Sequence, residues 1–135
     1  MTEYSPICTR LLSKEEIESV LSGLPALLDQ LVGSCILSAE YGTECNIHND
    51  LQYHPMAVGI GWLSQFLAES IDQRIYVPAK SELSITTPDR GLEMVFCHEH
   101  HIHLSGRDAA LIRRASESAL IKHLMDKNEC ATLGH

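Results

Sequence analysis

Basic side chains are scarce in this sequence. Its 135 residues include 10 lysine and arginine residues against 18 aspartate and glutamate residues, which gives a formal net charge of −8. A field of that sign repels phosphate backbones and anionic lipid, so binding to nucleic acid or to a membrane begins at a disadvantage. The same field attracts a basic protein. The shortage of cations therefore favours a basic protein as the partner.

Long apolar runs are missing as well. The longest uncharged run, residues 51–68, contains Gln52, His54 and two glycines, which predicts a buried segment and not a membrane span. Residues 1–10 carry Glu3 and have no apolar centre, so they do not have the pattern of a secretory signal. We therefore expect a cytoplasmic protein whose five widely spaced cysteines are reduced.

The common signatures of metal binding and catalysis are also absent. The sequence has no Cys-x-x-Cys pair, no His-Glu-x-x-His segment and no second ligand cluster at a diagnostic spacing. Cys97 with His98, and Cys45 with His48, could form a nucleophile and its base. Neighbours on a strand diverge, however, and nothing supplies a recognisable oxyanion hole. Buried or incidental cysteine is the simpler interpretation, and we do not expect an enzyme.

What is present is ordinary globular material, 44% hydrophobic and 21% charged. The composition shifts nowhere along the chain. We therefore expect one domain over residues 1–135, with flexible ends at 1–11 and 128–135.

The first helix has a clear start signal. Ser13 and Glu16 form a capping box ahead of apolar residues at helical spacing. Pro25 would clash with the preceding turn of a continuous helix. The pattern therefore predicts a helix to about Ser22, a second short helix from Pro25, and a C-terminal cap at Gly33.

The rest of the chain predicts strands and two further helices. Strands are expected at 34–41, 74–77 and 82–86, with a turn at 87–91. A largely apolar helix starting at Pro55 should be central, with Trp62 in the core, and Ser105 with Asp108 should cap the final helix. The expected class is α+β: a small antiparallel sheet, with a meander over about residues 74–104 and a strand near 34–41, packed with three to four helices.

Residues 92–104 hold the strongest strand pattern and a histidine-rich run. One long strand would place its alternate apolar residues on a single face. A hairpin with a three-residue loop at 98–100 also pools them, because Phe96 then lies opposite Ile102. That loop lacks Gly, Pro, Asn and Asp, although histidine tolerates positive φ better than most residues. We favour the long strand, bent or bulged near His98.

His101 and His103 would share one strand face and are candidate zinc ligands, with Glu99 or Cys97 nearby. Adjacent side chains on a strand point to opposite faces, so the whole histidine run cannot converge on one ion. Polar residues at a solvent face or under a loop, with one or two of them buried and hydrogen-bonded, are the preferred explanation of the run, and we expect no cofactor. A metal-binding protein or metal-dependent enzyme is the alternative function.

The preferred interpretation is a protein-binding module. Tyr41, Tyr53, Tyr76 and Trp62 are candidate anchors, since aromatic residues are over-represented in interface cores, although a place in the core is the preferred interpretation of Trp62. Glu44 and Asp50 could face a basic cleft. By class-level analogy, the size, the charge and the missing catalytic motif favour a bacterial immunity-type inhibitor that occludes the active cleft of a basic toxin such as a nuclease. A secretion-chaperone-like acidic homodimer is a further alternative.

Overall fold

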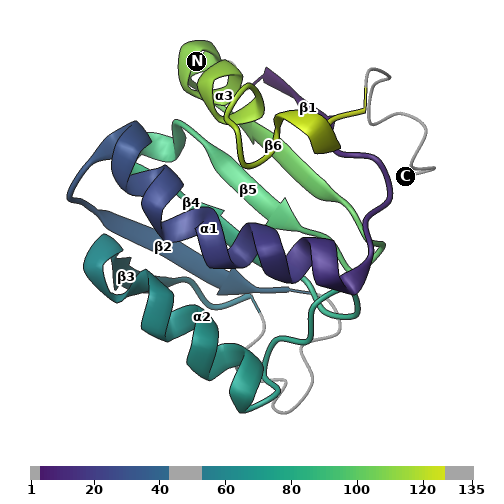
Figure 1. Ribbon diagram of the computed structural model, residues 1–135. Helices are drawn as coiled ribbons and strands as arrows, with labels where there is room; N and C mark the ends of the chain where they lie inside the picture. Colours follow the sequence, from purple (N-terminus) through teal and green to yellow (C-terminus); the bar gives the residue numbers. More distant parts are fainter. Residues whose placement is uncertain (1–3, 43–52, 127–135) are drawn as a thin grey trace.

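The computed structural model describes residues 4–42 and 53–126. Six strands form one antiparallel sheet in the order β1-β6-β5-β4-β2-β3, and three α-helices pack on it (Figure 1). The strands are β1 (Tyr4–Cys8), β2 (Ile36–Tyr41), β3 (Met56–Gly59), β4 (Leu83–Thr86), β5 (Glu93–Phe96) and β6 (Ile102–Gly106). The helices are α1 (Lys14–Val32), α2 (Leu63–Asp72) and α3 (Ala109–Ser116), with single 3-10 turns η2 (Ile60–Trp62), η3 (Pro88–Arg90) and η4 (Lys122–Leu124). The α+β class is confirmed, with a larger sheet than expected. Among the described residues, no helix combines the length and apolar character needed to cross a membrane.

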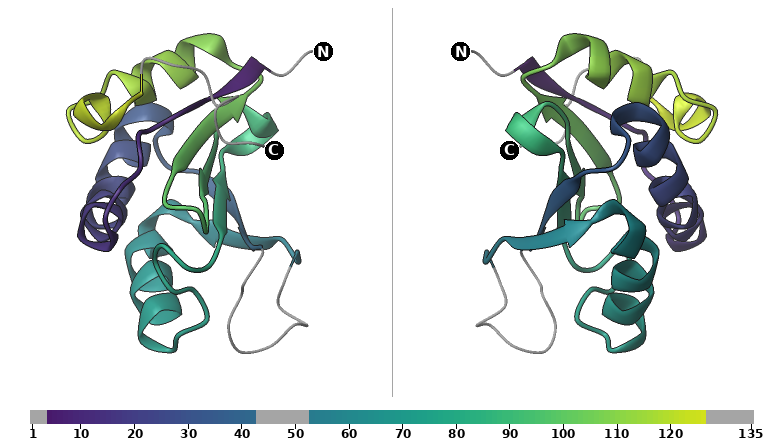
Figure 2. Two further views of the ribbon diagram at one scale, coloured as in Figure 1. Left: turned by 90° about the vertical axis from the view of Figure 1, so that its right-hand side faces the viewer. Right: turned by 90° about the vertical axis from the view of Figure 1, so that its left-hand side faces the viewer.

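The sheet has one face covered by helices and one open face, and side chains point to the two faces alternately along each strand. Side chains under the helices are apolar and buried, whereas those at the alternate positions are mostly polar or small and stay partly exposed. α1 and α2 lie over the covered face, and α3 packs beside α1 near the β1–β6 end (Figure 2). One row of the covered face is Tyr41, Leu83, Phe96 and Ile102, and the next row on the open face is Glu40, Ser84, Val95 and His103.

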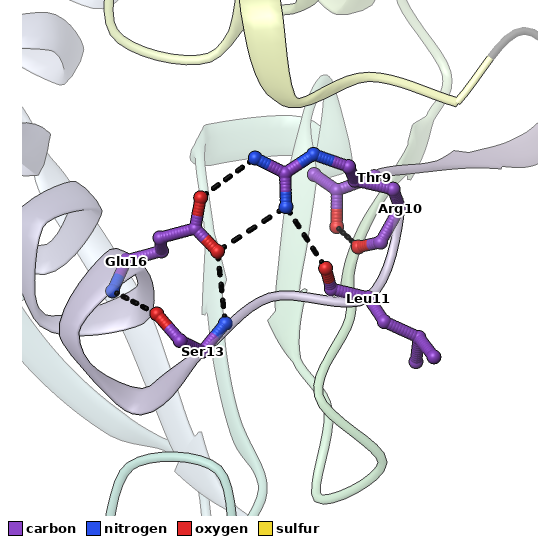
Figure 3. Close-up of polar contacts among 5 residues, drawn as sticks. All are labelled: Thr9, Arg10, Leu11, Ser13 and Glu16. Carbon is purple, nitrogen blue, oxygen red and sulfur yellow. Dashed lines mark hydrogen bonds and ion pairs between the residues drawn. The ribbon is translucent and has the colours of Figure 1, made fainter.

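The start of α1 is fixed by the predicted capping box. Ser13 Oγ accepts a hydrogen bond from the Glu16 amide at 3.1 Å, and Glu16 Oε1 accepts one from the Ser13 amide at 2.9 Å. Arg10 adds two contacts to the same carboxylate, at 2.6 and 3.2 Å (Figure 3). The Arg10 hydrogen bond and then the Ser13 amide lower the pKa of Glu16 to about 2.

The expected break at Pro25 is wrong, because α1 continues through the proline to Val32. A proline inside a helix costs about 3 kcal/mol. The residues that follow extend the buried side of α1, and full burial of Leu27 and Leu28 contributes about 1.5–3 kcal/mol each. This burial outweighs the local cost of the proline. The expected C-terminal cap at Gly33 is confirmed by a φ of 70° and a 2.9 Å bond from its N–H to the Asp29 carbonyl.

The preferred long strand over residues 92–104 is also wrong, and the alternative hairpin is right. Phe96 lies opposite Ile102 across β5 and β6. His100 takes a φ of 71°, the left-handed conformation that the loop requires. The tip of the hairpin gains a partner in the segment before α1, where the Leu12 amide donates to the His100 carbonyl at 2.9 Å. The turn therefore forms without its usual residues because a distant segment holds it.

The helix expected from Pro55 begins only at Leu63. The intervening residues form β3, which pairs with β2 at the edge of the sheet, and then η2. Gly59 and Gly61 account for the late start, since glycine is a poor helix former. Trp62, expected in the core, is 65% exposed.

Three smaller expectations are also corrected. The first residues, expected to be a loose arm, form β1 along β6 over Tyr4–Cys8. Residues 74–77 are not a strand, and Arg74 there has a φ of 59°. The last helix is capped by Asp108, whose Oδ1 accepts from the Leu111 amide at 3.1 Å, whereas Ser105 lies within β6. The expected flexible end at 128–135 falls outside the described residues.

Candidate functional site

Three side chains of metal-ligand type meet where β4 begins and the β5–β6 hairpin turns. Leu83 pairs with Phe96, so the preceding Glu82 and the following Cys97 lie at neighbouring places in the ladder. His98 Nδ1 is 3.4 Å from Glu82 Oε1 and 3.9 Å from Cys97 Sγ. The three ligand atoms all lie within 4.8 Å of one another. Among the described residues, this is the one convergent group of three or more such side chains.

The sulfur of this cluster is buried and faces negative charge. Cys97 is 5% exposed, and the Glu99 amide points at its Sγ from 3.4 Å. Burial raises the pKa of the Cys97 thiol, and the carboxylates of Glu82 and Glu99 raise it further. Cys35 is likewise a free thiol, whereas Cys8 is disulfide-bonded, so the expectation of five reduced cysteines is wrong at Cys8.

A buried phenol, that of Tyr76, lies within electrostatic reach of the thiol of this cluster. Tyr76 is 1% exposed, and its hydroxyl has no hydrogen-bond partner within the described part of the chain. Burial raises the pKa of Tyr76, and the nearby Cys97 raises it further, which places the two groups within electrostatic reach. Buried hydroxyls normally have a partner. The Tyr76 hydroxyl is therefore an unsatisfied polar group within electrostatic reach of Cys97.

The cluster is not arranged as a nucleophile with its base. A histidine that deprotonates a thiol while a carboxylate orients it uses its two ring nitrogens for the two contacts. Here both contacts of His98 are made by Nδ1. The raised pKa of Cys97 also opposes formation of a thiolate by itself. One sulfur, one nitrogen and one oxygen converging on a point are instead donors that suit zinc.

His101 and His103, which the sequence predicts as zinc ligands, lie outside this cluster. The rings of His101 and His103 are neighbours, with centroids 6.0 Å apart and planes at 73°. His101 is buried, His103 is half-buried and Glu99 is exposed. Sequence reasoning did not find Glu82, because its role depends on the pairing of β4 with β5. The proposed metal role of His101 and His103 stays a prediction.

Among the residues that the sequence predicts to bind a partner, Tyr41 and Tyr53 belong to the described part of the chain. Tyr41 is 4% exposed, and its hydroxyl contacts Ser70 Oγ inside the core. Tyr53 is 59% exposed, and its amide donates to the Tyr41 carbonyl at 2.7 Å, which holds it beside the end of β2. Glu44 and Asp50 lie outside the described residues.

Exposed apolar side chains gather along the ribbon made by β2 and β3. Ile36 is 62% exposed, Tyr53 59% and Trp62 65%; the remaining large apolar side chain exposed in the described residues, Leu11, lies before α1. Ile36 and Trp62 approach the same backbone, because a Cβ atom on Gly59 would lie 3.7 Å from Ile36 Cδ1 and 4.0 Å from Trp62 Cδ1. β3 is the last strand of the sheet, so one side of its backbone has no neighbouring strand in the described structure.

Hollows border this edge on both sides. A groove of about 610 Å³ lies on the open face, and a smaller one of about 300 Å³ lies between β3 and α2. The larger groove is lined by residues that include Ser38, Glu40, Thr86, Asp89, Arg90 and Glu93, and the smaller one by Val58, Trp62, Gln65, Phe66 and Glu69 among others. Carboxylates outnumber cations in both. The edge thus combines apolar anchors with negative charge.

Comparison of the chain with known protein families, with curated proteins and with solved structures found no match.

Proposed function

We propose that this chain is a protein-binding module that docks a basic partner along the β2–β3 ribbon. The observation that carries the proposal is the placement of three of the four exposed large apolar side chains of the described residues around the β2–β3 ribbon: Ile36 lies in β2, Tyr53 precedes β3 and Trp62 follows it. Monomeric proteins usually scatter such side chains singly. Together with the outer side of β3, which has no neighbouring strand among the described residues, these side chains provide both the anchors and the backbone groups that a partner can bind.

Trp62 is the expected energetic centre of this surface. Tryptophan is enriched among the few interface residues whose truncation costs about 2 kcal/mol or more. The hollow beside it, lined by Gln65, Phe66 and Glu69, gives a partner side chain room to pack against the indole. The outer side of β3 supplies backbone donors and acceptors for an added strand.

The charge of the chain selects the kind of partner. At a formal charge of −8, two copies of this chain repel each other over distances comparable with the Debye length. A basic partner is attracted instead, and complementary potentials speed the encounter. Glu40, Glu69 and Glu93 line the two hollows at the edge, where a partner would meet their charges.

The specific form of the proposal is an immunity-type inhibitor. A basic toxin that acts on nucleic acid must keep an electropositive cleft for its substrate. An acidic module that fills this cleft blocks the substrate without performing chemistry of its own. Such inhibition requires only tight binding and a complementary charge. The exposed apolar side chains of the β2–β3 ribbon would contribute to the first, and the carboxylates that line the two hollows would contribute to the second.

The test uses the chain as bait and two variants matched in exposure. Trp62 and Leu11 are both 65% exposed, so Trp62→Ala and Leu11→Ala remove equally accessible apolar groups from different surfaces. A stoichiometric basic partner captured by the wild type should be retained by Leu11→Ala and lost by Trp62→Ala. The purified pair is then assayed for inhibition of the partner's nuclease activity.

Three outcomes would oppose the proposal. Equal retention by the two variants would exclude the β2–β3 edge as the contact. Capture of an acidic partner would contradict the proposal that opposite charges attract the partner. A stable homodimer that loses its association in Trp62→Ala would support the secretion-chaperone-like alternative and overturn the inhibitor.

A further inference from the structure

We propose that Glu82, Cys97 and His98 form a zinc site that fastens the tip of the β5–β6 hairpin to the start of β4. This site is separate from the β2–β3 edge, and it uses one oxygen, one sulfur and one nitrogen donor. The structure contains all three ligand atoms already gathered within 4.8 Å.

The separations fit coordination of one ion better than direct hydrogen bonding. The 3.4 Å between His98 Nδ1 and Glu82 Oε1 exceeds the common range for such bonds, about 2.7–3.2 Å. Zinc binds nitrogen and oxygen at about 2.0–2.2 Å and sulfur at about 2.3 Å, which sets tetrahedral edges of about 3.3–3.6 Å. The observed separations from Nδ1, 3.4 Å to Glu82 and 3.9 Å to Cys97, lie at or just above these edges. Small side-chain shifts would complete the geometry.

The donor types select the metal. Calcium and magnesium prefer oxygen ligands throughout, whereas a thiolate, an imidazole and a carboxylate together suit zinc. Binding requires the thiol of Cys97 to lose its proton, which the ion itself promotes. Three protein ligands then leave the fourth position of the tetrahedron for water.

The fold positions the ligands for a structural purpose. Cys97 and His98 lie in the loop of the hairpin, and Glu82 lies on the chain entering β4. The Cys97 amide donates to the His101 carbonyl at 2.8 Å, so the base of the loop is closed before any ion binds. An ion held between β4 and the loop would add a cross-link to a turn that lacks the usual turn residues.

The unpaired hydroxyl of Tyr76 is a second observation that points to a ligand here. Tyr76 is 1% exposed, its hydroxyl has no hydrogen-bond partner within the described residues, and Cys97 lies within electrostatic reach of it. Metal-bound groups commonly receive hydrogen bonds from an outer ring of residues. A phenol hydroxyl is a donor of this kind, and a thiolate on zinc would accept a hydrogen bond from it more strongly than a neutral thiol does.

The experiment titrates zinc alone into the full chain, purified without an affinity tag and stripped of metal. Calorimetry should give one zinc per chain. Cobalt substituted for zinc should show the charge-transfer absorption of a thiolate ligand. The variants are Glu82→Gln, which keeps the size of a half-buried side chain, and Cys97→Ser; Cys35→Ser is the control because it removes a free thiol elsewhere. A double variant with His101→Ala and His103→Ala tests whether zinc binding depends on these two histidines instead.

Loss of an outer-ring partner weakens metal binding about 10–100-fold, so loss of a ligand should raise the dissociation constant at least about 100-fold. Both Glu82→Gln and Cys97→Ser should reach this value, and Cys35→Ser should remain within about twofold. Circular dichroism of the metal-free variants checks that each has folded. The proposal is overturned if folded Glu82→Gln and Cys97→Ser bind zinc as the wild type does. It is equally overturned if binding depends on His101 and His103, or if the wild type takes up no zinc at 100 times the protein concentration.

Discussion

The carboxylate of Glu82 lies directly over Gly42, so that a Cβ atom on Gly42 would stand 2.7 Å from Glu82 Oε2. The two residues are also joined by a 2.9 Å bond from the Gly42 amide to the Glu82 carbonyl. Glycine at this place therefore leaves the room in which the carboxylate rests. The position of one proposed zinc ligand depends on the missing side chain of another residue.

Gly42→Ala should weaken zinc binding without unfolding the chain. The new methyl group would displace the end of a flexible side chain, which costs little in stability, but it would move Oε2 away from its present position. We expect the dissociation constant for zinc to rise about tenfold, measured by calorimetry. Gly61→Ala is the control, because a Cβ atom there would meet nothing within 4 Å. An unchanged zinc affinity in Gly42→Ala would show that zinc binding does not depend on the present position of this carboxylate.

Tyr76→Phe should stabilise the metal-free chain. A buried hydroxyl without a partner costs about 1–3 kcal/mol, and the substitution removes it at nearly constant volume. We expect the free energy of unfolding in urea to rise by about 1 kcal/mol. Tyr41→Phe is the matched comparison: its hydroxyl bonds Ser70 Oγ, so its loss should lower the free energy by about 1 kcal/mol. Equal effects from the two variants would contradict the assigned difference in pairing.

Core and edge apolar residues should differ sharply in their contribution to stability. Leu104 is fully buried under the helices, and Leu104→Ala should lower the free energy of unfolding by about 2–5 kcal/mol. Trp62→Ala should change it by less than about 0.5 kcal/mol, because its side chain is 65% exposed. Chemical denaturation measures both. A large loss in Trp62→Ala would mean that the tryptophan serves the fold and is not a surface anchor.

Acid should lower the stability of the folded chain, in part by protonating Glu16. Its folded pKa of about 2 lies below the ordinary value of 4.5, so the charged form is favoured by folding. The resulting stability is present above about pH 4.5 and is lost as the pH falls toward 2. In Glu16→Gln, the midpoint of thermal unfolding should therefore depend less on pH over this window than it does in the wild type. Glu15→Gln, from the same first turn, provides the control, and identical acid profiles for Glu16→Gln and the wild type would refute the assignment.

Local signals in the sequence were sufficient for several elements. The capping box of Ser13 and Glu16, the cap at Gly33 and the turn at 87–91 each depend on residues close in the chain. β2 and β4 fall within the predicted strands at 34–41 and 82–86. These features follow from hydrogen bonds and apolar spacing that a short window already contains.

The elements that were missed are held by distant contacts. β1 and β3 are the two edge strands, and each exists because another strand pairs with it on one side. The hairpin tip at His100 is fixed by Leu12, 88 residues earlier. In α1, apolar burial on both sides of Pro25 outweighs the cost of the proline. Tertiary packing overrode the local preference in each case.

The candidate zinc site was only partly accessible from sequence. Cys97 and His98 are neighbours in the sequence, and a strand path predicts that their side chains diverge. The signal that could have added Glu82 was the turn at 87–91, because a hairpin around it sets Glu82 near Cys97. Nothing in the sequence pattern showed that Trp62 would be exposed.

The dissociation constant of the captured basic partner, measured with Trp62→Ala and Leu11→Ala at low and high salt, tests the central claim most directly. Docking along the β2–β3 ribbon predicts that Trp62→Ala raises the constant at least about tenfold, or 1.4 kcal/mol, and that added salt raises it for every variant. Leu11→Ala should stay within about twofold of the wild type. Equal constants for the two variants, or affinity that does not change with salt, would contradict the account.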